Sequence, residues 1–288
     1  MIGSIENDFL KISVKNSGAE LISIKNKKNN HEYLWQGDPK FWARRAPVLF
    51  PIVGKLKDNA YSIDGKSYQL LQHGFARDMH FEQIEKTSAT LVYSLKHSPE
   101  TLKNYPFKFE LLIKYELKKN KLKVAYDVKN LDTKKIYFSI GGHPAFSCPI
   151  VPNEKFNDYF LEFDVRENAE RYTLKDGLLT GATEPLLKDE KTLQLNHDLF
   201  AKDALVFKGL KSECIVLKSR RSKVKLNFNF KGFPYLGIWS KPGPFICIEP
   251  WFGHADYENA TGEFKDKEGI IALEKGKQFN CEYSVEID

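Results

Sequence analysis

The sequence predicts an all-β protein, a large antiparallel β-sandwich with few short helices. Most segments with a regular pattern either alternate apolar and polar residues or form short apolar runs, and both patterns are typical of strands. Thirteen prolines and eighteen glycines separate these segments. Helical periodicity is weak throughout. Because the 288 residues contain no linker, internal repeat or change in composition, we expect one domain over residues 1–288.

The expected elements follow one another at short intervals along the chain. Tyr61–Tyr68 carries a central Asp-Gly pair, the strongest short hairpin signal in the sequence. Residues 98–103 combine a Ser cap with a Pro at the first helical position, which predicts a short helix. The other expected strands cover residues 9–14, 20–25, 32–35, 67–71, 89–95, 107–117, 122–128, 135–140, 214–218, 223–230, 245–251, 269–273 and 279–287.

Composition and charge argue against several classes of protein. The net charge of +6 arises from 44 basic and 38 acidic residues, but the lysines are scattered. Nucleic-acid binding needs a concentrated basic stripe, and none is present. No signal peptide is apparent, and no apolar run approaches the roughly 18 residues of a membrane span. The four cysteines show no paired spacing, which predicts free thiols in a reducing cytoplasm. The absence of CxxC, HExxH and clustered His and Cys residues argues against a zinc site.

Glu249 is the most informative residue for function, because it is a carboxylate in an otherwise apolar segment. Residues 245–251, Phe-Ile-Cys-Ile-Glu-Pro-Trp, predict a buried strand in which Glu249 shares a face with Phe245, Cys247 and Trp251. A buried carboxylate needs a partner, a proton or a pocket. Two interpretations follow: a structural ion pair with Lys or Arg, or a catalytic base whose basicity desolvation raises.

Two histidines occur in motifs of similar character. His143 follows two glycines, which allow close approach of backbone or ligand, and precedes a proline that holds it in an extended conformation. His73 opens the sequence His-Gly-Phe-Ala-Arg. For either histidine alone, a structural hydrogen-bonding role explains the pattern as well as catalysis does. A carboxylate base with an imidazole acid suits proton transfer on a small polar substrate.

Five motifs occur in a characteristic order. They are Phe-Pro-Ile-Val-Gly-Lys (50–55), Ile-Asp-Gly-Lys (63–66), His-Gly-Phe-Ala-Arg (73–77), Gly-Gly-His-Pro-Ala-Phe (141–146) and Cys-Ile-Glu-Pro-Trp (247–251). Each is weakly specific alone, but the ordered set resembles the aldose 1-epimerase (galactose mutarotase) superfamily, and within it the bacterial LacX-like branch. The resemblance covers nearly the whole chain. It implies a β-supersandwich fold, in agreement with the expected strands.

The resemblance also implies a reaction and roles for three residues. Members of this family interconvert the α and β anomers of a free sugar by opening and closing the ring, a reaction that implies no metal, nucleotide or other cofactor. Motif by motif, Glu249 falls at the position of the general base, His143 at that of the general acid, and His73 at that of a second histidine that holds the sugar. We therefore expect Glu249 and His143 to face each other across a gap that admits a pyranose.

Several positions depart from the galactose mutarotase pattern. Galactose mutarotases place an Arg ahead of the Asp-Gly hairpin to hold a sugar hydroxyl, and by register this position is Lys55. Lysine cannot form the bidentate contact of arginine, and Arg77 is a candidate for the missing guanidinium. No motif locates the family's sugar-binding Asp, for which Asp203 is a candidate. Trp251 and Trp239 are candidate platforms for a sugar ring, although core packing explains Trp239 equally well.

The sugar recognised therefore need not be galactose, and further interpretations remain open. Arg45, Lys55 and Arg77 could form a cationic rim for a sugar phosphate, as in related hexose-6-phosphate mutarotases. The leading interpretation is a cytoplasmic mutarotase, a monomer or homodimer, with a small-molecule sugar or sugar phosphate as its partner. The alternative is a non-catalytic carbohydrate-binding protein on the same fold. A basic nucleic-acid-binding or surface-binding protein is favoured only by the pI near 8.9.

Overall fold

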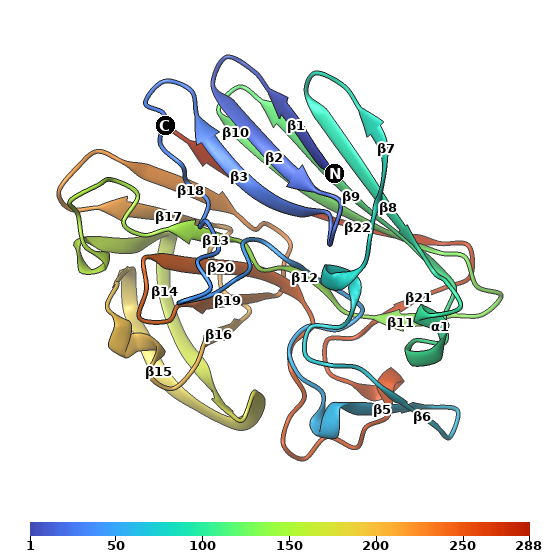
Figure 1. The fold of residues 1–288 in the computed structure, drawn as a ribbon. Helices are drawn as coiled ribbons and strands as arrows, with labels where there is room; N and C mark the ends of the chain where they lie inside the picture. Colours follow the sequence, from blue (N-terminus) through green and yellow to red (C-terminus); the bar gives the residue numbers. More distant parts are fainter.

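The computed structural model describes residues 1–288 and consists mainly of antiparallel strands, as the sequence predicts (Figure 1). Fifteen strands form one continuous sheet, in which β13 (Ala145–Ser147) pairs with β20 and β15 (Leu178–Gln194) pairs with β14 beside the main path. Along that path the order is β4 (Val48–Leu49), β12 (Ile140–Gly142), β20 (Phe245–Phe252), β19 (Tyr235–Trp239), β16 (Leu205–Lys208), β14 (Tyr159–Lys175), β17 (Cys214–Ser219), β18 (Lys225–Asn229), β22 (Gln278–Ile287), β10 (Lys121–Asn130), β9 (Phe109–Lys118), β8 (Thr90–Lys96) and β7 (Glu82–Lys86).

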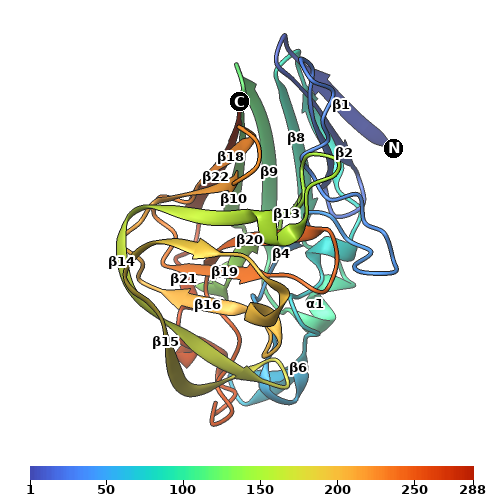
Figure 2. The same cartoon turned by 90° about the vertical axis from the view of Figure 1, so that its left-hand side faces the viewer.

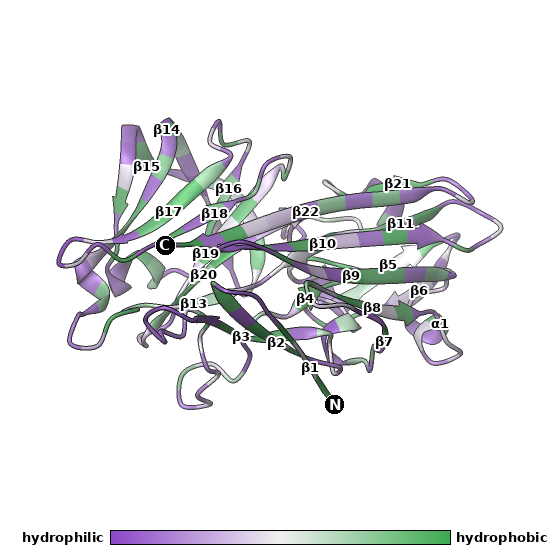
Figure 3. Ribbon diagram, turned by 90° about the horizontal axis from the view of Figure 1, so that it is seen from above, coloured by the Kyte–Doolittle hydropathy of each residue, from purple (hydrophilic) through white to green (hydrophobic).

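A second layer covers one end of this sheet. Figure 2 shows the three-stranded sheet of β1 (Ile2–Glu6), β2 (Leu10–Lys15) and β3 (Glu20–Asn26) stacked beside β8 and β9. Tyr115 of β9 crosses between the layers and donates a hydrogen bond from Oη to the carbonyl of Ala19 at 2.7 Å. Apolar and polar residues alternate along these strands (Figure 3), so each sheet turns an apolar face inward. The resulting core contains 63 buried residues.

Short elements complete the fold. Two-stranded sheets form from β5 (Ala60–Ile63) with β6 (Lys66–Gln69) and from β11 (Ile136–Phe138) with β21 (Ile271–Leu273). Asp64 and Gly65 have φ values of 50° and 72°, as the predicted two-residue hairpin requires. The only α-helix, α1 (Thr101–Asn104), has four residues, and its first N–H is capped by Ser98. No helix is long and apolar enough to span a bilayer.

Several elements differ from the sequence expectations, and two of the differences are notable for their size or position. Residues 32–35 form no named strand, because only Glu32 and Leu34 make isolated bridges there. The long hairpin of β14 and β15 (Leu178–Gln194) is not among the expected strands, although its two strands have 17 residues each. Its pairing contains four register shifts, and each shift breaks the alternation by which a strand is recognised in sequence.

Candidate active site

The alternation of β20 places Glu249 above a small aromatic cluster and away from the main core. Ile246 and Ile248 point into the main core, whereas Phe245 and Cys247 join a separate cluster on the opposite face. Glu249 is an even number of residues from Phe245 and Cys247 and therefore lies on the same face of β20, as the sequence predicts. Its side chain is 2 % exposed. Removing a carboxylate from water in this way is costly unless the group is paired or protonated.

The register of the neighbouring strands brings His143 opposite Glu249. Gly141 pairs with Trp251, and Ala145 of β13 (Ala145–Ser147) pairs with Cys247. The two pairings have the same register, so residue 143 falls opposite residue 249 without a shift. His143 Nε2 lies 3.3 Å from Glu249 Oε2. The expected gap between the two groups is therefore absent: they lie side by side in one wall of a cavity.

Burial governs the protonation of this pair. It raises the pKa of Glu249 well above its usual value, an effect that Asp203 reinforces and that the Trp251 indole N–H opposes. Burial also lowers the pKa of His143, and the nearby guanidinium groups of Arg77 and Arg44 lower it further. No Lys or Arg pairs with Glu249, whose ion-pair partner is His143. The contact therefore holds a shared proton better than two separated charges.

His73 is fixed beside this pair by the backbone of Gly54. The His73 N–H donates to the Gly54 carbonyl at 2.8 Å, and the Gly54 N–H donates to His73 Nδ1 at 3.1 Å. Because Nδ1 accepts this bond, a neutral His73 carries its proton on Nε2. Burial and the charge of nearby His143 lower the pKa of His73. The two imidazole rings are 5.6 Å apart and nearly perpendicular.

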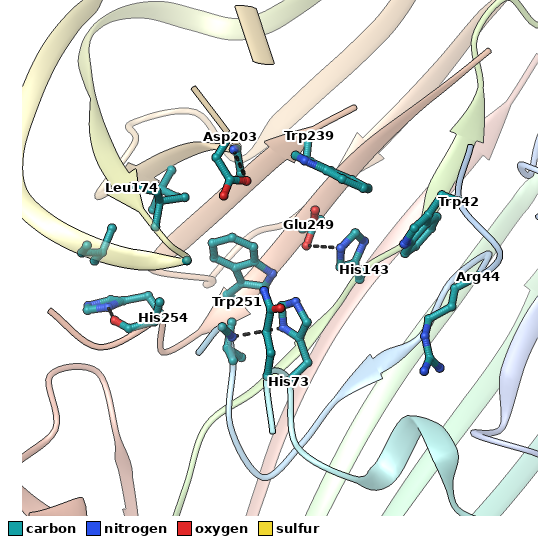
Figure 4. Close-up of a pocket in the computed structure, with 18 of the residues that line it drawn as sticks. Trp42, Arg44, His73, His143, Leu174, Asp203, Trp239, Glu249, Trp251 and His254 are labelled. Carbon is teal, nitrogen blue, oxygen red and sulfur yellow. Dashed lines mark hydrogen bonds and ion pairs between the residues drawn. The ribbon is translucent and has the colours of Figure 1, made fainter. Parts of the chain in front are cut away.

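These groups line a cavity of about 240 Å³ (Figure 4). The tip of the β14–β15 hairpin forms part of its wall through Leu174, Gly177 and Leu179. Asp203, which precedes β16, points into the same space (Figure 4). The structure thus gathers most of the residues singled out from the sequence around one cavity, namely His73, Arg77, His143, Asp203, Trp239, Glu249 and Trp251.

Two predicted residues lie outside this cavity. Lys55 belongs to an adjoining outer cleft of about 620 Å³, where its Nζ donates to the carbonyl of Asp176 at 3.0 Å. Arg45, a predicted substrate-binding residue, does not line the cavity, whereas its neighbour Arg44 does. The Arg45 backbone N–H donates to Glu20 Oε1 at 2.7 Å, and the chain bends at this residue. The proposed rim of Arg45, Lys55 and Arg77 does not form.

Several lining residues were missed from the sequence, among them Trp42, Arg44 and His254. Trp42 stacks on the His143 ring with centroids 4.7 Å apart. It lies in a segment without regular secondary structure, so no periodicity marks it. The available signal was the local density of aromatic and basic residues in Phe-Trp-Ala-Arg-Arg (41–45). His254 follows β20 closely, and its proximity to the Glu249 motif was the only clue.

Comparison with known proteins assigns the chain to a family. Residues 2–272 match the aldose 1-epimerase family. The chain is 38 % identical to Protein LacX (chromosomal) of Lactococcus lactis subsp. lactis over 261 residues, which cover 86 % of this chain and 87 % of that protein.

Two solved structures are also similar along the entire chain. A galactose mutarotase related enzyme from Lactobacillus acidophilus superposes with a TM-score of 0.96 at 36 % identity, covering 100 % of this chain and 97 % of that one. A galactose mutarotase-like protein from Lactobacillus casei ATCC 334 gives 0.94 at 33 % identity, with 100 % of both chains covered. The chain therefore belongs to the aldose 1-epimerase family and has a galactose mutarotase-like fold.

Proposed function

We propose that the protein is a mutarotase that interconverts the α and β anomers of an aldohexose by acid–base ring opening and closure. The observation that carries the proposal is the buried contact of Glu249 with His143, 3.3 Å apart at an open cavity. The anomeric hydroxyl oxygen and the ring oxygen of a pyranose are bonded to the same carbon. An acid and a base that lie side by side in one wall of the cavity can therefore reach both oxygens.

The proposed reaction exchanges one proton at each oxygen. With the shared proton on His143, the Glu249 carboxylate accepts the proton of the anomeric hydroxyl. The oxygen lone pair forms the carbonyl as the bond from the anomeric carbon to the ring oxygen breaks, and that oxygen takes the proton of His143. Rotation about the adjacent carbon–carbon bond presents the other aldehyde face. Reversal of both transfers closes the ring, and each positioned group contributes roughly 10²–10⁴-fold.

The remaining lining residues are proposed to hold the sugar. The Nε2–H of His73 donates to the oxygens beside the reacting carbon, and Asp203 accepts from a hydroxyl across the cavity. The rings of Trp239 and Trp251, both at the cavity, present apolar surface to the C–H face of the sugar. Arg77 is held by its hydrogen bond to the Gln72 carbonyl at 2.7 Å, and it contributes a hydroxyl donor at the edge of the site.

A phosphorylated hexose is a second candidate substrate, favoured by the charge at one edge of the cavity. Arg44 and Arg77 share a single carboxylate: Arg44 Nη2 lies 2.8 Å from Asp78 Oδ1, and Arg77 Nε lies 3.6 Å from Asp78 Oδ2. Two guanidinium groups against one carboxylate leave a net positive charge. Lys241 also lines the cavity. Guanidinium groups bind phosphate oxygens well, so Arg44 takes the role first considered for Arg45.

A non-catalytic carbohydrate-binding protein is the alternative. Binding alone does not need a buried carboxylate against an imidazole, an arrangement that is costly unless it performs chemistry. The contact of Glu249 with His143 therefore favours the enzyme.

Anomer exchange measured by NMR tests the proposal, with the spontaneous rate in buffer subtracted. Glu249→Gln keeps the shape of the side chain and removes the base, so the enzymatic rate should fall by at least ~10². Glu258→Gln, which changes a carboxylate outside the cavity lining, serves as the matched control and should exchange anomers at the wild-type rate. If Glu249→Gln and wild type exchange anomers equally fast while both bind the sugar, the binding-protein alternative holds.

A further inference from the structure

The acid–base pair has a third chemically active neighbour, the thiol of Cys247. The Sγ atom of Cys247, a ring nitrogen of His143 and a carboxylate oxygen of Glu249 all lie within 4.8 Å of one another. Cys247 and Glu249 share one face of β20, and His143 faces that strand from the neighbouring segment. All three side chains are buried, with Cys247 fully enclosed. Nitrogen, sulfur and oxygen donors thus lie close together, although His143 is far in sequence from Cys247 and Glu249.

We propose that His143, Cys247 and Glu249 form a binding site for a thiophilic divalent cation, for which Zn²⁺ is the probe, and that its occupation blocks the acid–base pair. Imidazole, thiolate and carboxylate are the three ligand types that Zn²⁺ takes in proteins. Three protein ligands leave a fourth position for water or a sugar hydroxyl. The binding step stands on the geometry alone, whereas the blocking step rests on the proposed mutarotase function.

The unsatisfied polar atoms of the site support this assignment. Glu249 Oε2 lies 3.3 Å from His143 Nε2 without a hydrogen bond of normal geometry, and His143 Nδ1 is buried with no partner, although buried polar atoms are usually hydrogen-bonded. A cation supplies that missing partner. Glu249 and His143 line the cavity, so an ion can reach them from solvent, while Cys247 completes the site from behind. β20 sets the positions of Cys247 and Glu249, and the pairings of β12 and β13 with β20 set the position of His143 between them.

Occupation changes the chemistry of the pair in a defined way. The Cys247 thiol releases its proton on binding, and the proton shared by His143 and Glu249 is displaced to solvent. The lone pairs that accept and return sugar protons are then engaged with the cation. Anomer exchange should therefore stop when the site is filled, and removal of the cation with a chelator should restore it.

Binding is tested on the full-length protein by competition against a chromophoric chelator for Zn²⁺, and by the absorption of the Co²⁺-loaded protein. We expect one ion per chain and a thiolate-to-cobalt charge-transfer band. Cys247→Ser should lose that band and bind Zn²⁺ at least ~10-fold more weakly, since even indirect perturbation of a metal site costs this much. Cys148→Ser, at a buried cysteine outside the cavity, is the matched control and should keep both properties.

Cys247→Ala provides a second variant if the serine disturbs folding, and far-UV circular dichroism checks both. The absence of stoichiometric Zn²⁺ binding, or an identical Co²⁺ spectrum in wild type and the Cys247 variants, would overturn the site. The blocking step has its own test. Zn²⁺ should inhibit anomer exchange of wild type and Cys148→Ser at lower concentrations than that of Cys247→Ser. Unchanged exchange at saturating Zn²⁺ contradicts the blocking step, and a protein that binds Zn²⁺ but never exchanges anomers contradicts the mutarotase function alone.

Discussion

The indole ring of Trp251 lies over Gly237, the residue that pairs with Glu249 on the neighbouring strand. A Cβ atom at Gly237 would stand 2.3 Å from both Cζ2 and Cη2 of Trp251. Gly237 pairs with Glu249 and Tyr235 pairs with Trp251 between β19 and β20. The glycine thus leaves room for the indole directly beside the carboxylate. The position of Trp251 and the environment of Glu249 therefore depend on one missing side chain.

Gly237→Ala should disturb both stability and the site. The methyl group has to displace a rigid indole, and overpacking of this kind costs about 1–3 kcal/mol. We expect a lower urea midpoint and slower anomer exchange. The double variant Gly237→Ala/Trp251→Phe is the control, because the smaller ring relieves the clash and should recover part of the lost stability. An unchanged midpoint in Gly237→Ala would show that the indole moves aside freely.

His73 allows binding and folding roles to be separated. Its φ of 68° is in the left-handed region, which asparagine tolerates, and an Asn side-chain oxygen can accept the Gly54 N–H in place of Nδ1. His73→Asn should therefore fold normally and lose only the Nε2–H donor, which raises KM about tenfold. His73→Ala also strands the Gly54 N–H, which costs a further ~1–3 kcal/mol of stability. Kinetics and urea unfolding separate the two effects, and an unaltered KM in His73→Asn contradicts the binding role.

Adjacent arginines test recognition of a sugar phosphate. Arg44 lines the cavity and Arg45 does not. If a hexose 6-phosphate is the substrate, Arg44→Ala should weaken its binding about tenfold relative to the unphosphorylated sugar, because one charge-assisted contact is lost. Arg45→Ala is the matched control and should leave that ratio unchanged. Equal affinity and turnover of wild type for a hexose and its 6-phosphate would remove the phosphate from consideration.

His254, in the wall of the cavity, is enclosed among charged groups. Burial lowers the pKa of His254 to about 4, and the charges of Lys208 and Lys267 act in the same direction. The contact with the Ala255 carbonyl and the charge of Glu268 raise the pKa and partly oppose this effect. The ring is 1 % exposed, and its Nε2 lies 3.4 Å from Glu268 Oε1. It also meets Tyr235 and Tyr257 edge-on. The folded state therefore keeps this imidazole neutral at pH values where an unfolded chain protonates it.

This difference makes stability depend on pH. Between the unfolded pKa of about 6.5 and the folded value of about 4, the unfolded chain binds the additional proton. The free energy of unfolding should thus fall as pH falls through this range, by up to about 3 kcal/mol. Urea unfolding at pH 7 and pH 4.5 measures the loss. His254→Gln removes the titrating group and should show a smaller loss, and an equal loss in both proteins would assign the pH dependence to other groups.

Local patterns predicted much of the fold because they act over a few residues. The turn at Asp64-Gly65 depends on two left-handed residues, and the faces of β20 follow from simple alternation. The β14–β15 hairpin could not be predicted in the same way, because its four register shifts interrupt the alternation. These shifts matter for the site, since the hairpin tip forms one wall of the cavity.

The chain by itself determined the strand pattern, the family motifs and the identity of the acid–base candidates, because each depends on residues close in sequence or on an ordered set of short motifs. Only the tertiary structure decided that Glu249 touches His143, that Arg44 rather than Arg45 lines the cavity, and that Cys247 joins the pair. These facts depend on strand register and on side-chain direction in irregular segments. A shift of one residue in the register of a strand would turn its side chains to the opposite face of the sheet.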